Sequence, residues 1–177
     1  MTLSDYIDLY QKALDIAEFA HRYQKRKVTG SPYIEHVRDV DRRVSERFSE
    51  YWNNEDNGEL GRMIHYYSLK IVATLHDVME DHPDHYDMDT FLNKDFPIEI
   101  VDALVFLNFK RDKRSYNDKV MVLRGPTLSH KYARFVKICD NLSNLSDHPS
   151  DKQIWKYTTS LRLLLYDDSK SIQREVH

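Results

Sequence analysis

Four side chains in this chain have the chemistry of metal ligands: His36, His76, Asp77 and Asp140. His76 and Asp77 are adjacent in a mostly apolar segment, residues 71–81, and Asp140 stands within another, residues 135–142. Burying an imidazole or a carboxylate among apolar residues costs free energy unless a partner compensates, and a metal ion is an effective partner. We therefore hypothesise that these four residues form a site for a divalent cation.

An acidic pair, Glu80 and Asp81, follows one helical turn after the His76-Asp77 dipeptide. Residues three and four positions apart share a face of a helix, so one stripe could present a nitrogen ligand and three carboxylates to the same pocket. A divalent ion lowers the pKa of bound water towards roughly 7, and Glu80 or Asp81 could accept the released proton. This combination favours a metal-dependent hydrolase over a binding module.

The ligand types narrow the choice of metal. Mixed imidazole and carboxylate ligands suit Mn²⁺, Fe²⁺ or Zn²⁺, and the absence of thiolate partners argues against a structural zinc site. His36 and Asp140 lie far from His76 along the chain, so only the tertiary fold can bring them into one pocket. An isolated Asp140 could equally be a helix-face residue paired with an arginine.

The elements that must position these residues are predicted to be helices. Four glycines and five prolines in 177 residues disfavour a turn-rich β architecture, and apolar residues recur at steps of three and four. We expect one all-α domain over residues 1–177 with about seven or eight helices and an exposed loop at 53–58. The expected helices cover residues 4–23, 32–52, 59–81 and 88–94, a segment from Pro97, then 115–123, 127–145 and 151–170.

Composition limits the partners. The net charge of −3 provides no general attraction to nucleic acid or to anionic membranes. No apolar run reaches the roughly 18–20 residues that span a bilayer, and the N-terminus lacks the pattern of a signal peptide. The single cysteine, Cys139, excludes an intrachain disulfide framework. The sequence therefore predicts a cytoplasmic protein that binds neither nucleic acid nor membrane.

Four segments in order carry a family pattern: residues 21–26 (HRYQKR), 29–36 (TGSPYIEH), 75–81 (LHDVMED) and 136–144 (VKICDNLSN). They resemble the successive motifs of HD-domain metal-dependent phosphohydrolases of the RelA/SpoT type, in particular the small alarmone hydrolases. The resemblance runs from about residue 10 to residue 160. It implies a single HD-type helical domain.

The resemblance also implies a role for each matching residue. The four metal ligands named above match positions that bind Mn²⁺, and Glu80 and Asp81 match the pair that orients and deprotonates the attacking water. Four further residues match substrate-binding positions: Arg26, Lys27, Asn144 and Tyr157. The implied reaction releases pyrophosphate from the 3′ position of guanosine 3′,5′-bispyrophosphate (ppGpp) or its pentaphosphate.

Other parts of the pattern differ from the family. Val37 stands where the family has a proline, Tyr23 stands where it has a glycine, and residues 48–57 form an aromatic and acidic insertion. Two alternatives therefore stay open. One is an HD hydrolase that cleaves a nucleoside phosphate or phosphodiester bond in another nucleotide, and the other is a catalytically silent nucleotide-binding HD protein. Another divalent cation could likewise replace Mn²⁺.

Overall fold

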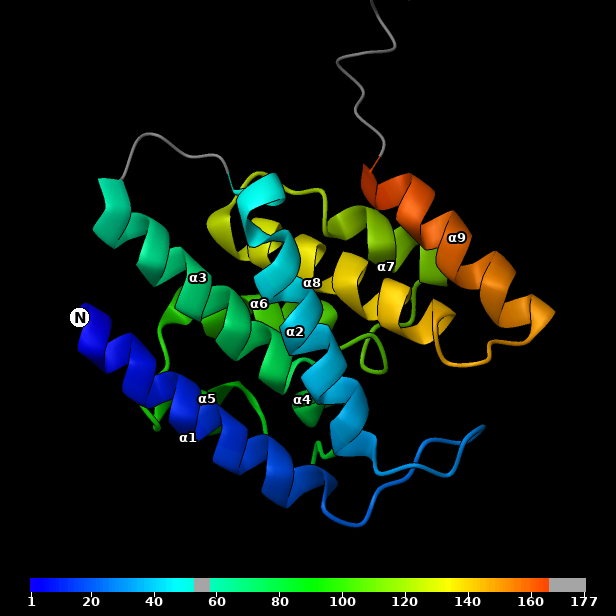
Figure 1. Ribbon diagram of the computed structural model, residues 1–177, viewed down its shortest axis with the longest axis horizontal. Coiled ribbons are helices and arrows are strands. Elements are labelled where there is room, and N and C mark those ends of the chain that lie inside the picture. Colours follow the sequence, from blue (N-terminus) through cyan, green and yellow to red (C-terminus); the bar gives the residue numbers. More distant parts are fainter. Residues whose placement is uncertain (53–57, 166–177) are drawn as a thin grey trace, which may run out of the picture.

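The computed structural model describes residues 1–52 and 58–165, which fold almost entirely into helices (Figure 1). Nine helices follow one another along these residues: α1 (Leu3–His21), α2 (Tyr33–Tyr51), α3 (Gly58–Leu75), α4 (Val78–Asp81), α5 (Met88–Leu92), α6 (Ile98–Leu107), α7 (Tyr116–Val122), α8 (Leu128–Leu145) and α9 (Asp151–Leu165). In the described ranges no β-strand forms, and one isolated antiparallel bridge joins Lys25 to Pro32. The all-α prediction is confirmed.

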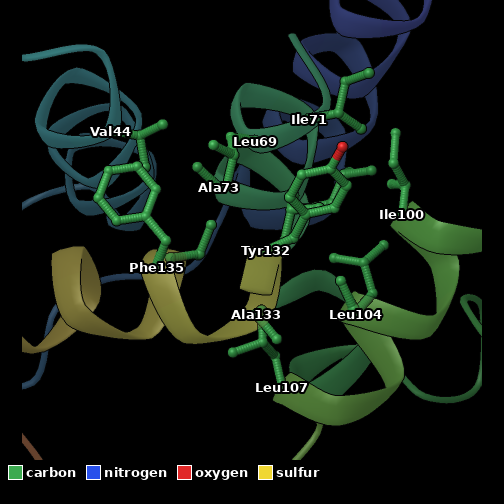
Figure 2. Close-up of a cluster of buried hydrophobic side chains, with 14 of the residues drawn as sticks. Val44, Leu69, Ile71, Ala73, Ile100, Leu104, Leu107, Tyr132, Ala133 and Phe135 are labelled. Carbon is green, nitrogen blue, oxygen red and sulfur yellow. The ribbon is translucent and has the colours of Figure 1, made fainter. Parts of the chain in front are cut away.

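Helix α3 lies at the centre of the fold, where it packs against α1, α2, α6 and α8 (Figure 1). Its apolar side chains Leu69 and Ile71 are fully buried in one cluster with Leu104 of α6 and with Tyr132 and Phe135 of α8 (Figure 2). Burying side chains of this size is worth about 1.5–3 kcal/mol each. The C-terminal end of α3, where His76 follows, is thereby fixed in the interior.

Local sequence signals set the helix starts. Thr2 caps α1 through a capping box with Asp5. Helix α2 begins directly after Pro32, whose φ of −55° is already compatible with a helix, and this start puts His36 in the first turn. Thr127 caps α8 by accepting a hydrogen bond from the amide of His130. Two of the helices that carry the predicted ligands thus have defined starts.

The helix expected over residues 59–81 is divided in two. Helix α3 ends at Leu75, and α4 begins at Val78 with Asp77 (φ −101°, ψ −10°) as its N-cap. The His76 ring pairs with the carbonyl of Ala73 (2.7 Å), the group that the Asp77 amide would use in a continuous helix. Sequence periodicity does not reveal this competition between the His76 ring and the Asp77 amide. Because α3 and α4 are separate, the described residues contain nine helices where about seven or eight were expected.

Smaller differences concern helix ends. Helix α1 ends at His21 and α5 ends at Leu92, each two residues before the expected end. Residues 53–57 of the expected loop and 166–170 of the expected last helix lie outside the described residues. None of the described helices is both long and apolar enough to cross a membrane.

Candidate metal centre

His36 is buried at the start of α2, with 6% of its surface exposed. Its Nδ1 lies 3.0 Å from the hydroxyl of Ser143 on α8, which fixes the orientation of the ring. The opposite nitrogen, Nε2, lies 3.2 Å from Oδ1 of Asp140 and 3.8 Å from Oδ2 of Asp77. One imidazole nitrogen therefore faces two carboxylates that come from distant parts of the chain.

His76 reaches the same point from the break between α3 and α4. Because its Nδ1 donates to the carbonyl of Ala73, the neutral ring keeps its lone pair on Nε2. That nitrogen lies 2.9 Å from Oδ2 of Asp77 and 3.8 Å from Oδ1 of Asp140. Adjacent residues of a continuous helix point about 100° apart and do not face each other. The helix break is what lets His76 and Asp77 converge.

Asp140 enters from α8 and is 4% exposed. Its Oδ2 accepts a hydrogen bond from the ammonium of Lys137 (2.8 Å), and its Oδ1 accepts one from the amide of Asn144 (2.6 Å). Burial alone would raise the pKa of Asp140, but the Lys137 charge and the neighbouring imidazoles outweigh it and hold that pKa well below its usual value. The carboxylate is ionised.

The four-donor cluster (His36, His76, Asp77 and Asp140) has the dimensions of a cation site. Ligand atoms bound about 2.1 Å from one ion lie roughly 3 Å apart, and Nε2 of each histidine here lies 2.9–3.8 Å from one carboxylate oxygen of Asp77 and one of Asp140. Nε2 of His76 is buried and makes no hydrogen bond, although Asp77 is close. Within the described residues, His36, His76 and Asp77 form a group that could hold a divalent ion, with Asp140 beside it.

The electrostatics of the four-donor cluster also favour a bound cation. Burial alone would lower the pKa of His76, but the Asp77 and Asp140 carboxylates outweigh it and raise that pKa to about 9. The buried Asp140 and the partly exposed Asp77 thus stabilise positive charge at this position. A divalent ion would satisfy the same carboxylates and would use the imidazole lone pair that the proton otherwise occupies.

The acidic pair lies beside the four-donor cluster, but its two members have different partners. Oε2 of Glu80 accepts from the backbone amide of Phe109 (2.9 Å), and Oε1 is 4.0 Å from the ammonium of Lys110. Asp81 has both oxygens engaged, by Lys110 (2.5 Å) and by the amide of Gln24 (2.7 Å). Burial and the nearby Asp77 charge raise the pKa of Glu80.

Every residue predicted to bind substrate lines one cleft beside this cluster. The cleft has a volume of about 470 Å³, and Asp77, Glu80, Asp81 and Asp140 also line it. The predicted substrate residues in its wall are Arg26, Lys27, Asn144 and Tyr157. His36 and His76 are buried behind this wall and do not line it.

The loop between α1 and α2 holds Arg26 in place. Gly30, with φ +72°, closes a turn in which its amide donates to the carbonyl of Arg26 (3.0 Å), and the Arg26 amide donates to the carbonyl of Ser31 (2.8 Å). The guanidinium then donates to Asp147 (2.7 Å) and to Asn144 (2.9 Å). Arg26 and Asn144, paired here, were predicted separately from two motifs.

The sequence analysis missed four cleft residues. Tyr33 donates to Oδ2 of Asp77 (2.5 Å), Lys137 pairs with Asp140, and Gln24 and Lys110 hold Asp81. Lys137 carries a visible signal, since it is the one cation between Phe135 and Asp140 in an apolar stretch. The other three act on residues 29–57 positions away, so their position in the sequence does not indicate their partners.

No protein-family model matches this chain, and no curated protein is similar to it.

Proposed function

We propose that this protein is a Mn²⁺-dependent nucleotide phosphohydrolase of the HD type, with guanosine 3′,5′-bispyrophosphate as its substrate. One observation carries the proposal. Two imidazole nitrogens each lie 2.9–3.8 Å from two carboxylate oxygens, the four residues come from three separate segments of the chain, and beside them is a cleft lined by both predicted acid–base residues. The resemblance of the four motifs to RelA/SpoT-type hydrolases supplies the substrate and the metal.

The charge of the cleft favours a polyanionic substrate. Six cationic side chains line it: Lys25, Arg26, Lys27, Lys110, Lys137 and Lys156. Five carboxylates oppose them, from Asp77, Glu80, Asp81, Asp140 and Asp147. With a divalent ion bound, the cleft is positive overall, and a cleft of one sign concentrates ligands of the opposite sign. Nucleotides with several phosphate groups fit this requirement.

Glu80 is the better placed of the two acidic residues to accept a proton. Asp81 uses both oxygens to hold Gln24 and Lys110, whereas Oε1 of Glu80 is 4.0 Å from the ammonium of Lys110. A carboxylate whose pKa is raised by burial is a stronger base than one in water. A bound divalent ion would supply the Lewis acid that acidifies water and offsets charge on a phosphoryl oxygen.

The remaining cleft residues suit the nucleotide itself. Arg26 presents a planar guanidinium that can bind a phosphate through two hydrogen bonds, and Lys27 is an exposed cation beside it. Tyr157 is half-buried in the opposite wall next to Lys156 and offers a ring for stacking. Asn144 connects this region to the four-donor cluster through its bond to Asp140.

The test is turnover by purified protein that has been stripped with a chelator and reloaded with Mn²⁺. Release of pyrophosphate and GDP is measured from guanosine 3′,5′-bispyrophosphate, beside a panel of NTPs, dNTPs and NADPH. Selective cleavage of the bispyrophosphate supports the full proposal. Cleavage of another panel member retains the hydrolase and replaces the substrate, and bound metal with no turnover of any member would refute the enzyme.

A further inference from the structure

Gln24 links the buried His21 to the partly exposed Asp81. Its Nε2 lies 2.7 Å from Oδ2 of Asp81, and its Oε1 lies 2.6 Å from Nδ1 of His21. Gln24 and Asp81 also line two cavities, the cleft described above and a neighbouring one of about 970 Å³ beside α1 and α5. The pair therefore stands at the boundary between the two spaces.

Only one arrangement of protons satisfies this chain of contacts. An ionised Asp81 can only accept, so the amide NH₂ of Gln24 must face it and the amide oxygen must face His21. The His21 ring must then donate from Nδ1. Burial lowers the pKa of His21, which favours the neutral ring and leaves Nε2 unprotonated. Nε2 is in fact buried without a hydrogen-bond partner.

The position of His21 is fixed by packing. It is the last residue of α1, is 1% exposed, and its ring lies 4.9 Å from the ring of Tyr33 and 5.2 Å from that of His82. Tyr33 in turn donates to Asp77 of the four-donor cluster. His21 is therefore a rigid donor against which the amide of Gln24 can be aligned.

We infer that His21 and Gln24 are positioning residues that orient Asp81, so that Asp81 holds Lys110 away from Glu80. The ammonium of Lys110 lies 2.5 Å from Asp81 but 4.0 Å from Glu80. If Asp81 turns away, Lys110 is left to pair with Glu80, and an ion pair stabilises the carboxylate against protonation. Gln24 thus preserves the basicity of Glu80. This consequence for catalysis rests on the proposed function.

The proton arrangement can be tested without any turnover. Histidine ¹⁵N shifts of the zinc-loaded protein, chosen because Zn²⁺ is diamagnetic, report which ring nitrogen of His21 carries the proton. We expect Nδ1–H with an unprotonated Nε2 in the wild type. The Gln24→Met variant should lose this single preference. A wild-type protein with the proton on Nε2 would overturn the inference, whatever its activity.

Kinetics test the consequence for Glu80. Gln24→Met should lower kcat about tenfold, with metal content and KM changed less than twofold, and His21→Phe should do the same. The double variant should have a kcat no lower than that of either single variant, because both substitutions interrupt the same hydrogen-bonded chain from His21 to Asp81. His21→Asn, which keeps a donor near the Nδ1 position, should stay within about threefold of wild type. Gln11→Met, at an exposed glutamine of α1, is the matched control.

A suppressor separates this role from general damage to the fold. Adding Lys110→Met to Gln24→Met removes the cation that would pair with Glu80, so part of the lost kcat should return. Purely structural damage would not be repaired by a second substitution at the rim. Additive losses, or an unchanged kcat in Gln24→Met, would refute the inference. An inactive wild type would refute the proposed function alone, and the His21 proton would still decide the inference.

Discussion

Two polar clusters involve α2 and α3, one largely buried and one partly buried, and they balance their charge in different ways. The four-donor cluster takes His36 from the start of α2 and His76 from just after α3. The second, which we call the Lys70 cluster, lies further along α2 and in the middle of α3. Its members are Tyr10, Asp41, Ser45, Tyr66 and Lys70.

The Lys70 cluster contains its own cation. The ammonium of Lys70 lies 2.9 Å from Oδ2 of Asp41 and 3.1 Å from Ser45, and 4.8 Å and 5.6 Å from the ring centres of Tyr10 and Tyr66. Tyr10 donates a second hydrogen bond to Asp41 (2.9 Å). One positive side chain and one negative side chain balance. Such an arrangement joins α1, α2 and α3 and needs no ligand.

In the four-donor cluster, two imidazole nitrogens and two carboxylate oxygens face one another instead. The ammonium of Lys137 contacts the outer oxygen of Asp140 and does not lie among the four donors. The comparison teaches that burial of charge alone does not mark a metal site. What distinguishes the candidate site is that two imidazoles and two carboxylates converge and, among the described residues, no lysine or arginine ammonium or guanidinium lies between them.

The largest expected effect breaks the four-donor cluster. His36→Ala and Asp77→Ala should each lower bound metal below about a tenth of an equivalent and lower kcat at least about a thousandfold, because a ligand is lost. Metal is measured by elemental analysis and kcat by pyrophosphate release. Asp41→Asn in the Lys70 cluster is the matched control and should keep both. A variant with full turnover and no bound metal would refute the site.

Next in size is the loss of the base. Glu80→Gln should keep the metal but lower kcat by about 100- to 1,000-fold, since it removes the proton acceptor without removing a ligand. Asp81→Asn, at the neighbouring carboxylate, should cost only about tenfold because Asp81 acts through Lys110. Both are measured on protein of verified metal content. Equal losses for the two variants would contradict the assignment of Glu80 as the base.

The Lys70 cluster should respond in stability and not in activity. Lys70→Met leaves Asp41 without its cation and should lower the free energy of unfolding by about 3 kcal/mol, with kcat of the folded enzyme unchanged. Denaturant unfolding measures the first quantity. Replacing both partners, with Lys70→Met and Asp41→Leu, should recover part of the loss. Lys131→Met, at an exposed lysine, serves as the control. A large drop in kcat would contradict the assignment of the Lys70 cluster to stability alone.

The smallest effect is a dependence of stability on alkaline pH. Burial and the Asp41 charge raise the pKa of Tyr10 from its usual 10.0 to about 12. A group whose pKa is raised by folding contributes stability that is present below pH 10 and lost as the pH rises through 12. The free energy of unfolding should therefore fall over this range, and less steeply in Tyr10→Phe. Identical slopes in the two proteins would contradict the role of Tyr10.

The sequence predicts the helices well and their interruption poorly. Periodicity and breakers such as Pro32 and Pro97 mark helix starts correctly, since these signals act within a few residues. The break after Leu75 depends on the hydrogen bond from the His76 ring to the carbonyl of Ala73. This bond forms where His76 is buried in the folded protein, so local sequence does not predict it. Helical periodicity predicts the opposite, a stripe shared by His76 and Glu80.

The site residues also divide into those that local sequence predicts and those that depend on tertiary packing. The candidate ligands, the acidic pair and the four residues predicted to bind substrate were chosen from residue types and from the family resemblance, and the fold brings them to one cleft and its buried wall. Their partners were not identified, because Gln24 and Tyr33 act over 57 and 44 residues. Contacts at such separations are a property of packing. Composition and spacing contain no record of them.

The interruption between α3 and α4 has a consequence for engineering. Joining the two helices into one would add backbone hydrogen bonds and remove a turn, which is a standard route to higher thermal stability. Here it would rotate His76 and Asp77 onto different faces while every donor stayed in the sequence. A stabilising design that keeps only the candidate ligand residues unchanged would therefore disrupt the candidate metal site. The backbone of residues 73–78 needs the same protection as the side chains it aims.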